Sequence, residues 1–282
     1  MSNQSKISQS INDAYFTPPD SVTWCHEILR QHNWLTPDTV IREPCVGSGA
    51  LVANLPNRII ASDLLNHGYP DASLANYLDA PSIPADLILT NPPFGRAGSL
   101  AGKILAKATK ECNRVAFILP ASFQKISLLD RIPTTHHLIF NQSLPNQNFI
   151  LPDGTTRKVL TVFQLWEQRH APRPKLGKIA PYRSYTERVS PEEAEFAFRT
   201  QGASAGKVLD GLSYNPASTA FLQGSQHRFR AHNWTTLAKM TAGIPAIGLN
   251  DVALGLYLED NGHNIETYLT QGPPSFYLHY ND

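Results

Sequence analysis

The sequence has few cysteines, little net charge and no long apolar run, and each absence excludes a class of protein. Its three cysteines, at positions 25, 45 and 112 of 282 residues, have no C-x-x-C spacing. This excludes a disulfide framework and argues against a structural zinc site. No run of 18 apolar residues occurs, and the polar first ten residues lack the apolar core of a signal peptide. We expect a cytoplasmic globular protein with no membrane or metal partner.

Charge is sparse and nearly balanced along most of the chain. Charged residues make up 17% of the sequence and the net charge is +1, so a contact with nucleic acid would need a local basic patch. Residues 167–188 are the exception, with six Lys and Arg against two Asp and Glu, and they contain three prolines. We interpret 168–188 as a basic linker. It could be a solvated connector or a strip that contacts phosphates beside an active site.

Short apolar runs alternate with amphipathic segments through the N-terminal two thirds. This pattern predicts helices at 21–32 and 100–110 and strands at 39–43, 58–63, 85–90, 114–119, 137–140 and 158–166. Strands that alternate with helices favour an α/β fold with a Rossmann-like, doubly wound, mostly parallel sheet, whose ligands lie at the carboxyl ends of the strands. We expect a disordered tail at 1–12, this domain at 13–167, the linker, and a small C-terminal α+β extension at 189–282.

The first expected strand ends in a turn with two glycines. Its sequence is Glu43-Pro44-Cys45-Val46-Gly47-Ser48-Gly49, and two glycines one residue apart let a ligand approach the backbone closely. The third glycine of a dinucleotide fingerprint is missing. Glu43 would repel a pyrophosphate but suits an ammonium or a sulfonium group. The turn therefore favours a cationic ligand.

Two further acids follow the next strands. Asp63 stands at the end of the second strand, where a carboxylate can accept hydrogen bonds from ribose hydroxyls. Asp79 stands where a third strand could end, and it could accept from an exocyclic adenine amine. Each acid alone could equally be a helix cap or a turn residue. Together with Glu43 they predict a pocket for a cationic nucleoside without phosphate, which S-adenosylmethionine fits better than NAD.

The strand at 85–90 ends in Asn91-Pro92-Pro93-Phe94. Two consecutive prolines end a strand ladder and leave extended backbone with free carbonyls. The exocyclic amine of adenine is a poor nucleophile, because its lone pair is delocalised into the ring. The Asn91 side-chain oxygen and the Pro92 carbonyl can hold its two hydrogens out of plane and aim the lone pair at a methyl group, while Phe94 stacks on the base. The alternative is a proline-rich turn with no catalytic role.

Taken in order, these motifs resemble those of the S-adenosylmethionine-dependent adenine-N6 DNA methyltransferases of the Asn-Pro-Pro-Phe/Tyr type, which are class I methyltransferases. The resemblance covers about residues 13–167. It implies a base flipped out of the DNA stack and catalytic roles for Asn91, Pro92, Pro93 and Phe94. It implies that the cofactor is bound by Tyr15, Thr17, Pro18, Glu43, Pro44, Gly47, Gly49, Asp63, Asp79 and Asn91. Phe149 would stack on the other face of the base, unless it is a loop aromatic that covers the edge of the core.

The catalytic motif leaves the methyl acceptor open. Adenine in RNA carries the same amine, and a protein glutamine amide has the same delocalised lone pair, although the helical domain of the release-factor glutamine enzymes is missing. A catalytically silent decoy that binds S-adenosylmethionine or DNA would keep the same fold. We expect DNA as the partner, with RNA as the alternative. The recognition sequence, the oligomeric state and a role in restriction, protection or regulation stay open.

The C-terminal 94 residues are fewer than the recognition domain of restriction-type enzymes. Segments 199–207 and 218–222 resemble the tail of phage-type and prophage-type methyltransferase-like proteins. Segment 227–234 interleaves cations and aromatics as nucleic-acid surfaces do. The extension is therefore our candidate for target recognition.

Overall fold

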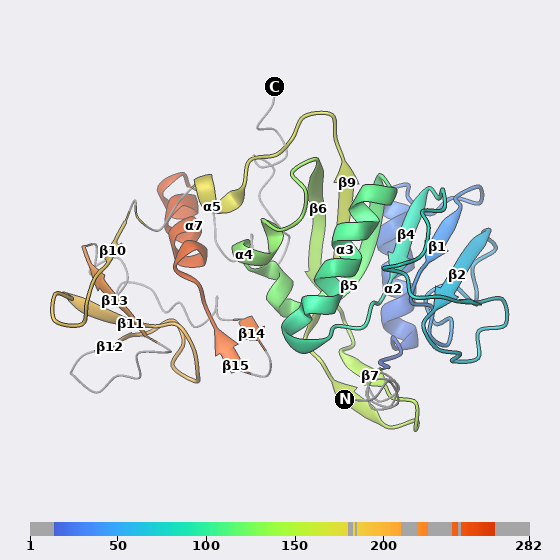
Figure 1. Ribbon diagram of the computed structural model, residues 1–282, viewed down its shortest axis with the longest axis horizontal. Coiled ribbons are helices and arrows are strands. Elements are labelled where there is room, and N and C mark those ends of the chain that lie inside the picture. Colours follow the sequence, from blue (N-terminus) through green and yellow to red (C-terminus); the bar gives the residue numbers. More distant parts are fainter. Residues whose placement is uncertain are drawn as a thin grey trace. The chain divides into compact units, whose positions relative to one another are not determined.

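A computed structural model describes residues 14–179, 183, 185–209, 219–224, 239–241 and 244–262. The chain forms two compact units (Figure 1). Unit 1 comprises 1–120 and 135–172, and unit 2 comprises 121–134 and 173–282. We expected the first domain to be one continuous stretch that ends near residue 167. In the structure, residues 121–134 belong to unit 2, and the chain then returns to unit 1 until residue 172. The predicted tail at 1–12 and the cationic and aromatic segment at 227–234 lie outside the described residues.

Unit 1 is built on a seven-stranded sheet in the order β3-β2-β1-β4-β5-β9-β6. Strand β9 runs antiparallel to both of its neighbours, and the other neighbouring strands are parallel. The bounds are β1 Ile41–Glu43, β2 Ile59–Asp63, β3 Ser73–Leu74, β4 Leu87–Thr90, β5 Arg114–Pro120, β6 His136–Ser143 and β9 Thr161–Gln168. The fold is a Rossmann-like, mostly parallel α/β sheet, as the alternating pattern predicted.

Successive side chains of the buried strands point to opposite faces of the sheet, so an apolar layer lies on each face. One layer includes Leu87 and Leu89 of β4 and packs with Cys25 and Leu29 of helix α2, Pro19–Gln31. Helix α3, Ser99–Glu111, covers the other face with buried residues such as Leu105 (Figure 1). Side chains of successive strand residues point to opposite faces, so continuous apolar strands need helices on both.

The remaining elements of unit 1 lie at its edges. They are the 3-10 turn η1, Arg96–Gly98, and the two-stranded pair of β7, Asn148–Ile150, with β8, Thr156–Lys158. An isolated bridge joins Phe16 to Ile150 of β7. The β7–β8 hairpin therefore holds the N-terminal segment that precedes α2.

Unit 2 combines strands and helices, as expected for the C-terminal extension. Its four-stranded sheet has the order β10-β13-β11-β12. The described bounds are η2 Ala121–Gln124, α4 Ile126–Leu129, α5 Leu176–Ile179, β10 Glu187–Arg188, β11 Phe196–Arg199, β12 Val208–Leu209, β13 Thr219–Gln223, β14 Lys239–Thr241, β15 Ile244–Ala246 and α7 Leu249–Asp260.

The segment interpreted as an extended linker is folded over much of its described length. Arg173 is 8% exposed, and its guanidinium donates to the main-chain oxygens of Leu129 and Ile132. Asp130 accepts from the first two main-chain N–H groups of α5 at 2.7 and 2.9 Å. The interpretation of this stretch as an extended, solvated linker was wrong at Arg173. One of the positive charges that suggested a linker belongs to this buried arginine, which is hydrogen-bonded to main-chain carbonyl groups. Among the described residues, no helix is long and apolar enough to cross a membrane.

Candidate functional site

A cavity of about 280 Å³ lies within unit 1, at the carboxyl ends of β1, β2, β3 and β4. Carboxyl ends of parallel strands share one edge of a sheet, which is why turns far apart in sequence meet there. The cavity is lined by residues 14–17, 43–48, 50–51, 63–65, 67, 75–78, 91–94, 100 and 104. Most of the motifs singled out in the sequence therefore meet at one site.

The side chain of Asn91 has a fixed orientation at this site. Its amide nitrogen donates to the main-chain oxygen of Tyr15 at 2.8 Å and to the hydroxyl of Thr17 at 3.2 Å. Within the described part of the chain, neither the Asn91 Oδ1 atom nor the main-chain oxygen of Pro92 has a partner. Since both donor positions of the amide are used inside the protein, two acceptor oxygens remain for a ligand.

The turn that carries Asn91 is anchored by the helix that follows it. The main-chain oxygen of Phe94 accepts from the N–H groups of Leu100 and Ala101 at 3.2 and 3.4 Å. Gly95 has a φ of +65°, and a Cβ there would lie 2.8 Å from the Cβ of Leu100. Phe94 and Pro93 are half-buried, and both line the cavity. The turn and the first turn of α3 therefore pack as one piece.

The N-terminal segment is held against the same turn from the other side. Phe16 exchanges two main-chain hydrogen bonds with Ile150, of 2.8 and 3.0 Å. Arg157 of the β7–β8 hairpin donates to the hydroxyl of Tyr15 at 3.0 Å. Thr17 is only 3% exposed. The partners of the Asn91 amide are thus fixed by a hairpin that lies about 140 residues later in the chain.

The glycine turn and Asp63 form a second fixed group. One carboxylate oxygen of Asp63 accepts from the N–H of Gly47 at 2.8 Å, and the other accepts from the N–H of Leu65 at 3.2 Å. Gly47 has a φ of +55° and Gly49 a φ of +84°, where only glycine is free of strain. Asp63 therefore orders the turn and still presents a half-buried carboxylate to the cavity.

Glu43 lies at the cavity with an exposed fraction of 1%. Burial raises the pKa of its carboxyl from 4.5 to about 8; the N–H of Cys45, which donates to it at 3.0 Å, opposes that shift, and the nearby Asp63 adds to it. Burial also raises the pKa of the Cys45 thiol, so this cysteine is not a thiolate nucleophile at neutral pH. A cation in the cavity would favour the charged form of Glu43.

The charge of the cavity selects among ligands. Among the described residues, Glu43 and Asp63 are its acidic lining residues and no Lys or Arg lines it. Most of the remaining lining is apolar. A phosphate would be repelled by the Asp63 carboxylate, whereas a cationic nucleoside would be attracted to it and would favour ionisation of Glu43 as well. Among the described residues, no group of three or more His, Cys, Asp and Glu side chains is placed to hold a metal ion.

Four residues predicted to belong to the site do not line the cavity. Pro18 is buried at the start of α2, and Gly49 acts through the backbone of its turn. Asp79 is exposed and accepts a 2.6 Å hydrogen bond from Asn76. Phe149 is 0% exposed in the core, with its ring edge-on to Tyr15. That burial matches the alternative of an aromatic in the core, and the predicted stacking role of Phe149 has no support from this geometry.

Sequence reasoning missed the wall formed by residues 75–78. Strand β3 has only two residues, both exposed, and it ends at Leu74, so the wall begins with the next residue, Ala75. His67 was also missed; its ring packs edge-on against that of Phe16, with centroids 5.9 Å apart. The wall could have been found only by locating the end of β3. A strand of two exposed residues has no apolar pattern that marks its end in the sequence.

The sheet is mostly parallel, with β9 antiparallel between β5 and β6. The chain has a Rossmann-like α/β fold. No protein-family model matches it, and no curated protein does.

Several solved structures are similar to part of the chain. A protein from Pyrococcus horikoshii, provisionally named an RNA methyltransferase, matches with 13% identity and a TM-score of 0.45, over 56% of this chain and 89% of that one. The M protein of the type I restriction enzyme EcoKI matches with 16% identity and a TM-score of 0.43, over 55% of this chain and 44% of that one. A type I restriction-modification methyltransferase subunit from Streptococcus thermophilus has 16% identity and a TM-score of 0.39, over 56% and 45%. The chain thus spans less than half of either restriction subunit.

Proposed function

We propose that the protein transfers a methyl group from S-adenosylmethionine to the exocyclic N6 amine of adenine in DNA. The observation that carries the proposal is the state of Asn91: its amide nitrogen is fully used by Tyr15 and Thr17, and its oxygen is left free in a cavity with two carboxylates. This is the arrangement needed to accept a hydrogen bond from an amine beside a cationic methyl donor.

The cavity residues fit the methyl donor. Glu43 would lie near its ammonium and sulfonium groups, and Asp63 would accept from its ribose hydroxyls while keeping the bond to Gly47. Residues 75–78 would form the wall beside its adenine. When bound, S-adenosylmethionine supplies an electrophilic methyl group on a positively charged sulfur.

The acceptor side of the reaction needs positioning more than proton transfer. Asn91 Oδ1 and the Pro92 carbonyl would each accept one hydrogen of the adenine N6 amine. This pulls the nitrogen toward tetrahedral geometry and directs its lone pair at the methyl carbon. Phe94 would stack on the flipped base. The nitrogen becomes positively charged as the C–N bond forms and the C–S bond breaks, so its proton then leaves readily to solvent.

The experiment that tests this function uses purified full-length protein and S-adenosylmethionine labelled in the methyl group. Its substrates are DNA and RNA from a host without adenine methylation, and a protein extract, followed by nucleoside and amino-acid analysis. We expect label in N6-methyladenine of DNA. Asn91→Ala should bind the donor normally by calorimetry and transfer no methyl group. Label found in RNA or in glutamine, or label still transferred by Asn91→Ala, would contradict the proposal.

A further inference from the structure

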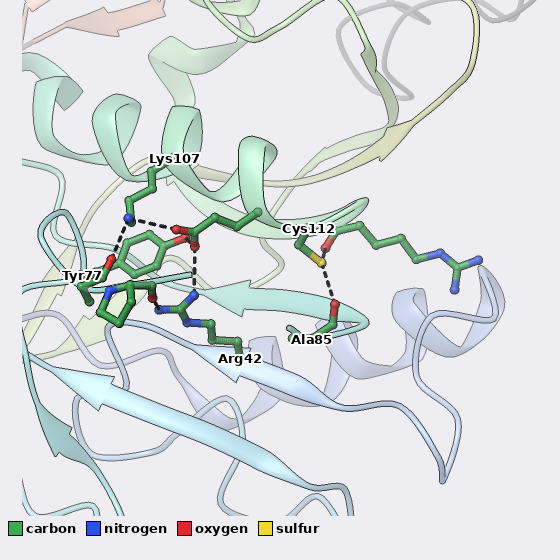
Figure 2. Close-up of polar contacts among 9 residues, drawn as sticks. Arg42, Tyr77, Ala85, Lys107 and Cys112 are labelled. Carbon is green, nitrogen blue, oxygen red and sulfur yellow. Dashed lines mark hydrogen bonds and ion pairs between the residues drawn. The ribbon is translucent and has the colours of Figure 1, made fainter. Parts of the chain in front are cut away.

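A buried cluster of charges stands behind the wall at 75–78, outside the cavity lining. Arg42 of β1 and Glu111 of α3 form an ion pair of 2.9 Å with side chains 2% and 7% exposed (Figure 2). Lys107, one helical turn before Glu111, pairs with its other carboxylate oxygen at 2.9 Å and is 23% exposed. These three side chains take no part in the chemistry described above.

The cluster is also hydrogen-bonded to Tyr77 of the wall and to the two residues at 80 and 81 that follow the wall closely. Arg42 donates to the main-chain oxygen of Pro81 at 3.1 Å, and Lys107 donates to that of Ala80 at 2.9 Å. The hydroxyl of Tyr77 donates to Glu111 at 2.7 Å. Figure 2 shows the Tyr77 ring between the two cations, whose charges lie 4.9 and 5.4 Å from its centroid. Residues 75–81 are thus fixed at Tyr77 and, at their C-terminal end, at Ala80 and Pro81.

Tyr77 connects the cluster to the cavity directly. It is 3% exposed and lines the cavity, and its hydroxyl donates to Glu111. Helix α3 makes a second connection, because Ile104 lines the cavity and Lys107 and Glu111 follow it at helical spacing on the same face. A shift of the cluster would therefore move both sides of the cavity at this end.

Stability alone gives little reason for such a cluster. Moving charges out of water is costly, and apolar side chains of similar volume often replace a buried ion pair without loss of stability. Apolar side chains, however, could not donate to the oxygens of Ala80 and Pro81. What the charges add is a defined position for a segment that has almost no regular structure of its own.

We propose that Arg42, Lys107 and Glu111 are positioning residues that set the affinity for the methyl donor by fixing the wall at 75–78. The inference rests on the proposed function, since it takes the cavity as the donor site. These residues would act on donor binding and leave the methyl-transfer step unchanged once the donor is bound.

The test compares Lys107→Met with Lys103→Met in the full chain. Lys103 lies one turn earlier on α3, is exposed, and has no contact with residues 75–81 in the described structure. Lys107→Met keeps the aliphatic stem and loses both the hydrogen bond to Ala80 and the ion pair with Glu111. The KM for S-adenosylmethionine and the calorimetric Kd for S-adenosylhomocysteine should therefore rise roughly tenfold with kcat unchanged. Lys107→Arg should restore both constants, and amide exchange at 75–81 should be faster in Lys107→Met only.

Tyr77→Phe provides a second variant that removes only the bond to Glu111, and it should raise the same KM by a smaller factor. An unchanged Kd in Lys107→Met and Tyr77→Phe, an equal effect of Lys103→Met, or a fall in kcat at constant KM would each overturn the inference. These outcomes differ from failure of the proposed function: if the cavity is not the donor site, the wild-type protein itself binds no S-adenosylmethionine, and if only the acceptor is wrong, the wild type binds the donor but labels RNA or protein.

Discussion

The amide of Asn91 and the hydroxyl of Thr17 lie 3.2 Å apart and join the turn after β4 to the segment before α2. Both residues face the cavity, and Thr17 is almost completely buried. This contact fixes which end of the Asn91 amide points toward a ligand.

Thr17→Val should therefore impair the reaction without unfolding the protein. Valine has the shape of threonine but cannot accept from the Asn91 nitrogen, so one of two bonds that orient the amide is lost. We expect kcat to fall about tenfold and Thr17→Ser to stay near the wild-type rate. Steady-state kinetics at saturating S-adenosylmethionine would measure both, and a Thr17→Val enzyme of normal kcat would contradict the orienting role.

Asp63→Asn should weaken binding of the methyl donor. The amide keeps one oxygen but replaces the other acceptor by a donor, so it cannot accept from both Gly47 and a ribose hydroxyl. The expected loss is about 2 kcal/mol, roughly a thirtyfold higher Kd for S-adenosylhomocysteine by calorimetry. Asp71→Asn, an exposed acid outside the cavity lining, is the control. Equal affinities of Asp63→Asn and wild type would exclude a ribose contact.

Glu43 should make the stability of the unliganded protein depend on pH. Its pKa is about 8 in the folded protein, against 4.5 as the ordinary value. Between these values the folded state retains a proton that the unfolded state releases, so stability should fall as pH rises from 4.5 to 8. Urea unfolding of wild type and Glu43→Gln at pH 5, 6, 7 and 8 measures this, and the variant should show the weaker slope. Identical slopes would mean that Glu43 is not the group responsible.

Gly49→Ala should destabilise unit 1 through two separate effects. A Cβ at Gly49 would overlap the ring of Tyr69, and the φ of +84° is strained for alanine. Gly154→Ala separates the effects, because its φ is +83° but no atom lies within 4 Å of the new Cβ. We expect a loss of about 1 kcal/mol for Gly154→Ala and about 2–3 kcal/mol for Gly49→Ala in the free energy of unfolding. Equal losses would show that Tyr69 moves aside freely.

The sequence was most informative where strands are buried. The buried strands at 41–43 and 87–90 are recognisable in the sequence, and the turn after Glu43 and Asn91, which follow their ends, both line the cavity. Parallel strands end at one edge, so motifs distant in the chain could be placed together without a structure.

Prediction failed where position depends on contacts between distant residues. Asp79 was predicted to contact the adenine, whereas Asn76 lines the cavity, and a two-residue strand has no recognisable end from which to place them. Phe149 was assigned to the base pocket, yet it packs into the core from a hairpin whose bridge to Phe16 has no local signal. The basic charge at 168–188 did not distinguish an exposed cation from Arg173, whose partners lie about 40 residues earlier.

The position of β9 has a consequence for how the protein is made. This strand pairs with β5 from Arg114 opposite Glu167 to Pro120 opposite Thr161, and with β6 on its other side. A growing polypeptide released from the ribosome would thus hold the apolar edge of β5 unpaired until residue 168 had emerged. A chain that ended between residues 121 and 160 would lack β9 and leave that edge exposed, so residues 1–120 alone should aggregate rather than fold as a smaller enzyme.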